Sequence, residues 1–156
     1  MGYLRTYIDL TTLISKLKYI EPMMEFVFHA SDVVNDFESL RVPVVVAGHL
    51  ALAMMKHAHG TITDIHIVIM TDTPAETIQH LIATFPEKYT VVHENSRQSG
   101  NKFILSNDRG STLVSVAFVP CNSPIHPVLK RDWHEVLGVP VLQNVELLRM
   151  VRSILE

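Results

Sequence analysis

The sequence predicts a single α/β domain, in which a short mixed β-sheet is flanked by helices. Apolar residues make up 47% of the 156 residues and charged residues 19%, which is enough apolar material for one well-filled core. Short β-branched runs alternate with segments of helical period, and no linker or internal repeat divides the chain. We therefore expect one domain over residues 1–156, with N-terminal helices over 1–40 and a core over 41–156.

The N-terminal part carries two helical patterns. Apolar residues recur at helical spacing over residues 4–20, and Pro22 marks a break. A second pattern follows, and its apolar positions are Met23, Val27, Ala30, Val34 and Phe37. Because neither segment contains an internal glycine, we expect two helices in front of the sheet.

A strand, a helix and a second strand come next. Residues 42–47 are a β-branched run typical of a buried strand, and Gly48 ends it. Residues 49–58 are apolar almost all round, which predicts a buried helix. After a turn at Gly60, residues 64–70 read as a second strand.

The third helix has the clearest local signature. Thr73, Pro74 and Glu76 are placed as an N-cap, a first-turn proline and the partner of a capping box. Pro86 ends the segment. One face carries apolar side chains at the spacing i, i+3, i+4 and i+7, namely Ile78, Leu81, Ile82 and Phe85.

The remaining chain predicts three more strands, an irregular segment and a final helix. The expected strands cover residues 89–93, 102–105 and 112–119, with a polar loop over 94–101 and a hairpin turn over 107–110. Residues 121–139 read as irregular, and the final helix carries Leu147, Leu148, Val151, Ile154 and Leu155. Trp133 is interpreted as an anchor against the sheet, with a ligand-stacking platform as the alternative.

Composition excludes several classes of protein. The chain has one cysteine, Cys121, so an internal disulfide framework and a cysteine-based zinc site are excluded, and a reducing cytoplasmic setting is expected. No apolar run approaches the ~20 residues that a membrane span needs. The 13 Lys and Arg residues are scattered and the net charge is −3, so the sequence lacks the basic footprint of a duplex-DNA binder.

Three motifs carry a resemblance to a known family. They are Val45-Val46-Ala47-Gly48-His49-Leu50-Ala51-Leu52, Thr63-Asp64-Ile65-His66-Ile67-Val68, and Val139-Pro140-Val141-Leu142 followed by Glu146-Leu147-Leu148. In this order the chain resembles the minimal domain of the nucleotidyltransferase superfamily, and more closely its antitoxin-associated and abortive-infection group. The resemblance implies that Gly48 and His49 hold a nucleotide phosphate and that Asp64 is the first catalytic carboxylate.

The chemistry of that family requires several carboxylates. Nucleotidyl transfer uses two divalent ions, and Mg²⁺ prefers hard oxygen ligands. The family places them as Asp-x-Asp on one strand, with a third carboxylate on a later strand. Here the resemblance puts Asp64 at the first position, His66 at the second and Ser115 at the third. It also puts Ala47 at the first glycine of the family's pair. The sequence thus predicts a catalytically degenerate nucleotidyltransferase-like protein that acts as a nucleotide-binding or protein-interaction module.

Two alternatives remain open at this stage. Asp64 and His66 could bind one metal ion in a rebuilt enzyme site, because carboxylate and imidazole suit Zn²⁺, Mn²⁺ or Fe²⁺. Gly48 could serve a phosphate or simply a tight strand-to-helix turn. We expect no cofactor unless the protein is active, in which case Mg²⁺ or Mn²⁺ would serve. The expected partners are a nucleotide, a partner protein or a second copy of the chain. Convergence of Asp64, His66 and Ser115 is the structural test of the resemblance.

Overall fold

The computed structural model describes residues 23–92, 102–124 and 133–142. The helix predicted over residues 4–20, the polar loop over 94–101 and the final helix around 147–155 lie outside the described residues. Residues 23–39 are helical, as the second N-terminal pattern predicts. The other elements are β1 (Val44–Ala47), α2 (Gly48–Met54), β2 (Ile65–Met70), α3 (Pro74–Thr84), β3 (Tyr89–Val91), β4 (Lys102–Asn107), β5 (Gly110–Val119), β6 (Trp133–Val136) and β7 (Val139–Leu142).

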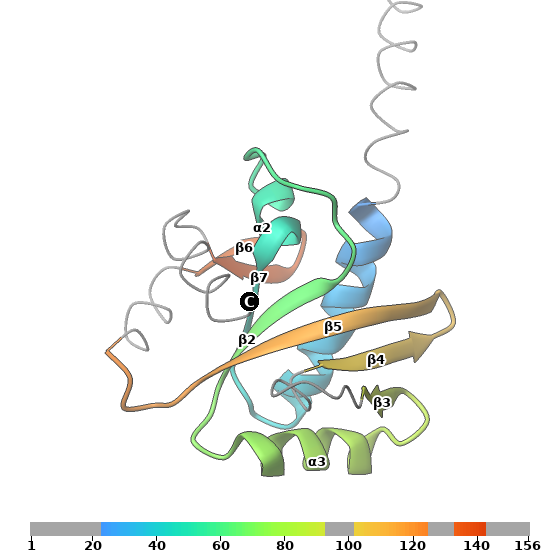
Figure 1. The fold of residues 1–156 in the computed structure, drawn as a ribbon, viewed down its shortest axis with the longest axis vertical. Helices are drawn as coiled ribbons and strands as arrows, with labels where there is room; N and C mark the ends of the chain where they lie inside the picture. Colours follow the sequence, from blue (N-terminus) through green and yellow to red (C-terminus); the bar gives the residue numbers. More distant parts are fainter. Residues whose placement is uncertain (1–22, 93–101, 125–132, 143–156) are drawn as a thin grey trace, which may run out of the picture.

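The strands form one mixed sheet in the order β3-β4-β5-β2-β1-β7-β6. β1 and β2 are antiparallel, whereas β5 is parallel to β2 and β7 is parallel to β1. The 23–39 helix (blue) crosses the sheet, and α3 runs along the end near β3 (Figure 1). The predicted fold class, a mixed sheet flanked by helices, is confirmed.

The core lies between the sheet and the 23–39 helix. The apolar positions that predicted this helix are buried from Val27 onward, and Phe37 is fully buried. Ile65, Ile67 and Ile69 alternate along β2 and are fully buried on one face of the sheet, as the two-residue period of a strand requires. The other face of β2 begins with His66, which is only partly buried. That face carries the polar residues described below.

A polar cluster, the Asp36 anchor, fastens the 23–39 helix to the β3–β4 end of the sheet. It consists of Asp32, Asp36, Lys88, Tyr89 and Asn107. The hydroxyl of Tyr89 donates to Asp36, and Lys88 pairs with both aspartates. The amide of Asn107 donates to Asp32 at 2.7 Å. Burial raises the pKa of Tyr89, and its hydrogen bond to Asp36 raises that pKa further. Buried charges and hydroxyls are therefore satisfied here by partners from elements distant in sequence.

The predictions for the end of the helix over residues 49–58 and for the cap of the third helix are wrong. The buried helix predicted over residues 49–58 ends at Met54, because Lys56 has a φ of +62° and residues 56–60 are exposed. The capping box at the third helix does not form, since Thr73 makes no side-chain capping bond. Instead its backbone N–H donates to the hydroxyl of Thr71, and its carbonyl accepts from the hydroxyl of Thr77.

The segment predicted as irregular contains a hairpin. β6 and β7 pair in antiparallel register, with Val136 opposite Val139. The two residues between them, Leu137 and Gly138, have φ values of +52° and +79°, the pattern of a two-residue hairpin turn that matches strand twist. The side chain of Trp133 at the start of β6 is 47% exposed, so it is not an anchor buried against the sheet. None of the helices within the described residues is long and apolar enough to cross a membrane.

Candidate functional site

Asp64, His66 and Ser115 converge at one end of the sheet. The hydroxyl of Ser115 donates to Oδ2 of Asp64 at 2.7 Å, and Nε2 of His66 donates to the same oxygen at 2.9 Å. The hydroxyl of Thr63 lies 3.3 Å from Oδ1. We call Asp64, His66 and Ser115 the Asp64 cluster. Its formation is the outcome that the resemblance predicted.

Strand register explains why these residues meet. Asp64 directly precedes β2, and His66 is two residues further on, so both side chains leave the same face of an extended chain. His66 pairs with Ser115 across the parallel β2–β5 ladder. Since paired residues of neighbouring strands project from the same face, Ser115 reaches the carboxylate from the adjacent strand.

Hydrogen bonds keep Asp64 ionised. Burial alone would raise the pKa of its carboxyl group, but the bonds from His66 and Ser115 outweigh burial and hold the pKa below its usual range. Nε2 of His66 carries the proton that is donated to Asp64. Nδ1, the other ring nitrogen, takes no part in this bond. Nδ1 of His66 is buried and has no hydrogen-bond partner among the described residues.

Gly48 lies directly against the ring of His66. Its φ is +71°, and a Cβ added to Gly48 would stand 2.7 Å from Nδ1 of His66 and 2.8 Å from Cβ and Cγ of the same residue. A side chain at this position would therefore be strained and would also overlap the imidazole. The structure supplies a structural reason for the glycine, independent of any phosphate.

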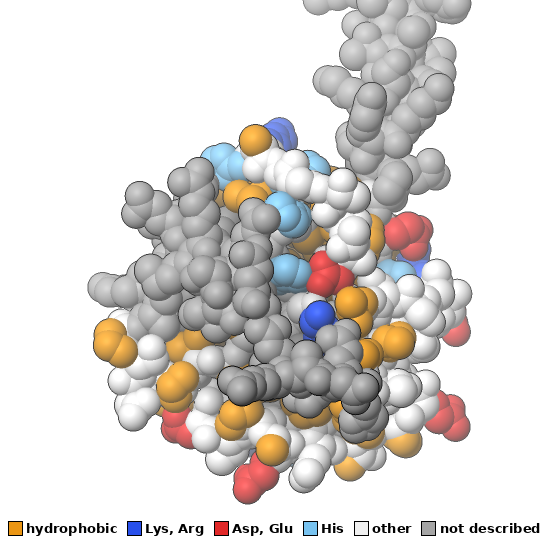
Figure 2. All heavy atoms as spheres, viewed as in Figure 1, with side chains coloured by type: hydrophobic (Ala, Val, Ile, Leu, Met, Phe, Trp, Pro, Cys, Tyr) orange, Lys and Arg blue, Asp and Glu red, His pale blue; other side chains and the backbone are white. Residues whose placement is uncertain are grey.

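His49 organises the segment that leads into Asp64. Its Nδ1 accepts a hydrogen bond from the backbone N–H of Gly60 at 2.9 Å. Because a backbone N–H can only donate, the neutral ring carries its own proton on Nε2. Figure 2 shows histidine side chains gathered in front of α2 and β2, next to an acidic and a basic side chain.

Lys102 is a candidate residue that the sequence did not reveal. It pairs with Ser115 across the β4–β5 ladder, and Ser115 in turn pairs with His66. Lys102, Ser115 and His66 therefore form a row across three strands on one face of the sheet. In the sequence, Lys102 is an ordinary cation at the start of a strand after a polar loop. Only the strand register brings it to the cluster.

The donor set around Asp64 does not match a metal centre. Within residues 23–92, 102–124 and 133–142, no three His, Cys, Asp or Glu side chains form a group that could hold a metal ion. Asp64 and His66, the predicted metal ligands, are hydrogen-bonded to each other, and metal binding by them stays a prediction. Two catalytic metal ions would each need several oxygen ligands, and this cluster offers one carboxylate.

A polar cavity of about 430 Å³ lies beside Thr63, the neighbour of Asp64. Its lining residues are Glu25, Phe26, His29, Thr63, Arg109, Ser111, Thr112 and Leu113. Nδ1 of His29 donates to the carbonyl of Glu25 at 2.7 Å, while its buried Nε2 has no partner among the described residues. The guanidinium of Arg109 lies over the ring of Phe28 at 3.9 Å, which covers an otherwise exposed aromatic side chain of the 23–39 helix.

No protein-family model and no curated protein matches the sequence. Among solved structures, the chain is similar to an antigenic nucleotidyltransferase-like protein from Paracoccidioides brasiliensis, with a TM-score of 0.51 and 18% identity over 75% of this chain and 59% of that chain. It is also similar to a presumed nucleotidyltransferase from Thermotoga maritima, with a TM-score of 0.52 and 16% identity over 83% of each chain. The chain thus spans less than two thirds of the first relative. These likenesses show a nucleotidyltransferase-like fold.

Proposed function

We propose that this protein is a catalytically degenerate nucleotidyltransferase-like module that binds a nucleotide near Gly48 and His49 without two-metal chemistry. The observation that carries the proposal is the bonding of Asp64. Its carboxylate accepts bonds from His66 and Ser115, the residues that stand at the second and third carboxylate positions of the resemblance. A metal ion at Oδ2 of Asp64 would have to displace these bonds, and a metal ion at either oxygen would find no second carboxylate in the cluster.

The same substitutions remove two negative charges from the site. His66 and Ser115 stand where the family has carboxylates and donate their hydrogen bonds to Asp64, and Lys102 adds a cation in the same row. His49 follows Gly48 directly, and its ring is held by the backbone N–H of Gly60. A lysine on this face can hold a phosphate oxygen directly through a charge-assisted hydrogen bond. Nucleotide binding by this site would therefore not require Mg²⁺.

Calorimetric titration with ATP, once with EDTA and once with Mg²⁺, tests the proposal. We expect binding in EDTA, with no gain from Mg²⁺. Lys102→Ala is expected to weaken binding about tenfold, the size of one lost charge-assisted contact. Lys56→Ala, an exposed lysine after α2, is the matched control and should bind as the unchanged protein does. Binding that appears only with Mg²⁺ would contradict the proposal.

Nucleotidyl transfer by the protein would contradict the proposal that it is catalytically degenerate. If the protein transferred nucleotide from a labelled nucleoside triphosphate with Mg²⁺ or Mn²⁺, and Asp64→Ala abolished the transfer, the protein would be an active enzyme. Stoichiometric metal in carefully prepared protein, lost in His66→Ala, would instead support the rebuilt Asp64/His66 metal site.

The protein-interaction role is the second half of the proposal. A partner protein or a second copy would need an exposed apolar surface. On the described part of the 23–39 helix, Phe28 is the large apolar side chain with high exposure, at 40%, and Arg109 lies over its ring. The exposed apolar surface on this helix is therefore small, and we expect nucleotide binding to be the role exercised in the cytoplasm.

A further inference from the structure

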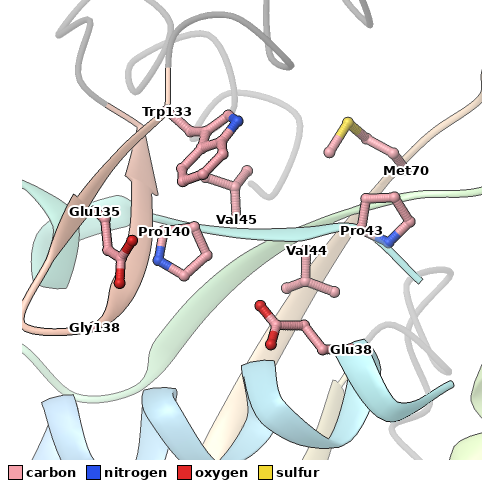
Figure 3. A pocket seen from close by; sticks show the side chains of 9 residues that line it. All are labelled: Glu38, Pro43, Val44, Val45, Met70, Trp133, Glu135, Gly138 and Pro140. Atoms are coloured by element: carbon pink, nitrogen blue, oxygen red, sulfur yellow. The ribbon is translucent and has the colours of Figure 1, made fainter. Parts of the chain in front are cut away.

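A second cavity lies at the opposite end of β1 and β2 from the Asp64 cluster. Ala47 pairs with His66 at the cluster end, whereas Val44 pairs with Ile69 at the other end. Six residues of extended chain separate Asp64 from Met70, which corresponds to about 20 Å. The cavity has a volume of about 500 Å³. It is lined by Glu38, Pro43, Val44, Val45, Met70, Trp133, Glu135, Gly138 and Pro140 (Figure 3).

The strand pairing explains why the sheet opens here. β1 and β7 pair at Val46 and Val141, near the end of β1 that is farther from the cavity. Pro140, the neighbouring residue of β7, has no N–H to donate to that ladder. The start of β1 therefore forms the floor of the cavity. The end of the 23–39 helix and the β6–β7 hairpin form its walls (Figure 3).

The lining combines an apolar floor with an exposed indole. Pro43, Val44, Val45 and Pro140 supply aliphatic surface. Trp133 lies across Val45 at the mouth of the cavity and is 47% exposed (Figure 3). The face of an indole ring attracts organic cations and stacks on flat apolar groups. A volume of about 500 Å³ lies within the range of about 300–1,000 Å³ typical of small-molecule sites.

The charge of the lining has one sign. Figure 3 shows Trp133 beside Val45 on one side of β1 and the carboxylate of Glu38 beside Val44 on the other, while the carboxylate of Glu135 comes from β6 next to Pro140. No Lys or Arg is among the described residues that line the cavity. Neither carboxylate forms an ion pair with another described residue. An anionic ligand would be repelled here, while a cation beneath the indole would meet an aromatic face and the carboxylate of Glu135 together.

We propose that this cavity is a binding site for a small organic cation, an ammonium or guanidinium group carried on an apolar or aromatic body. The apolar body would rest on Val45 and Pro140 beneath the indole of Trp133, and the cationic head would lie beside Glu135, with Glu38 adding negative charge from the helix side of β1. The site is separate from the Asp64 cluster and does not depend on nucleotide binding there.

The sequence provides a reporter for the test, because Trp133 is the only tryptophan in the chain. Phenethylammonium, its neutral analogue phenethyl alcohol and its anionic analogue hydrocinnamate are titrated separately while tryptophan emission is recorded. We expect a saturable change with phenethylammonium, at least about tenfold weaker binding of the alcohol, and no response to hydrocinnamate. Calorimetry of the same titrations checks that the emission change reports binding.

The double variant Glu38→Gln/Glu135→Gln should bind phenethylammonium about as weakly as the alcohol, a loss of about tenfold. Glu76→Gln/Glu87→Gln removes the same net charge at two exposed positions outside the cavity and should leave the affinity unchanged. Circular dichroism shows whether both variants are folded, and Glu135→Gln alone replaces the double variant if it is not.

Four results would overturn the proposal. The first is no saturable response to phenethylammonium, and the second is equal affinity for the neutral alcohol. The third is an equal loss in the Glu76→Gln/Glu87→Gln control, which would reduce the effect to overall charge. A response to a lysine-rich peptide but not to phenethylammonium would make the cavity a docking site for a basic protein segment and would also contradict the proposal.

Discussion

Gly48 and His66 fit together at the scale of single atoms. The imidazole occupies the volume that a side chain at residue 48 would need, with 2.7 Å between the added Cβ and Nδ1 of His66. We expect Gly48→Ala to lower the free energy of unfolding by about 2–4 kcal/mol, because a left-handed conformation and an overlap act together. Denaturant unfolding measures this change.

Gly138→Ala separates the two causes. Gly138 has a φ of +79°, but a Cβ there would meet nothing within 4 Å. This variant should lose only the conformational part, about 1–2 kcal/mol. In the double variant Gly48→Ala/His66→Ala the overlap is absent, so the two changes should be less than additive. Equal losses for Gly48→Ala and Gly138→Ala would show that the ring of His66 plays no part.

Asp64 should make the stability of the folded protein depend on pH in the acid range. Its folded-state pKa lies below the ordinary value of 3.8, so folding favours the ionised carboxylate. The stability that Asp64 contributes is therefore present above pH 3.8 and is lost as the pH falls through the lowered pKa. We expect the difference in Tm between the unchanged protein and Asp64→Asn to shrink below pH 3.8. Glu87→Gln, on the exposed turn after α3, controls for the loss of a carboxylate. A difference that stays constant with pH would contradict this account.

At the scale of elements, the Asp36 anchor holds the 23–39 helix to β3 and β4. Asp36 is 8% exposed and accepts from the hydroxyl of Tyr89. Tyr89→Phe should therefore cost about 1–2 kcal/mol of unfolding free energy, since a buried carboxylate loses a donor. Thermal or denaturant unfolding measures the cost. In an Asp36→Ala background the cost of Tyr89→Phe should fall toward zero, and persistence of the full cost would place its origin elsewhere.

Local signals predicted elements well where chain neighbours determine them. The helical period over residues 23–37, the β-branched runs and the turn over 107–110 all describe interactions within a few residues, and the structure contains each of them. The β6–β7 hairpin was missed because its turn places Leu137, a residue that rarely adopts a positive φ, at +52°. Cross-strand pairing with β1 compensates for that cost, and no local pattern contains this information.

At the scale of the whole molecule, the residues that form the site are determined by which strands are neighbours in the sheet. The two-residue spacing of Asp64 and His66 was enough to place them on one face. Ser115 required the parallel β2–β5 pairing, which the resemblance implied, and Lys102 required the next ladder as well. The cavity beside Trp133 joins three segments distant in sequence, so the sequence alone could not predict it.

The pairing of Val46 with Val141 joins positions about 95 residues apart. β1 is buried at all four positions. Its neighbour on this side of the sheet is β7, which is synthesised much later than β1. Until β7 has been synthesised, β1 therefore has one unpaired apolar edge, and such an edge can associate with other chains. Closing so long a loop also delays the last step of folding. In refolding experiments, the emission of Trp133 on β6 should reach its native value after the far-ultraviolet circular dichroism signal does, and coincident traces would contradict this order.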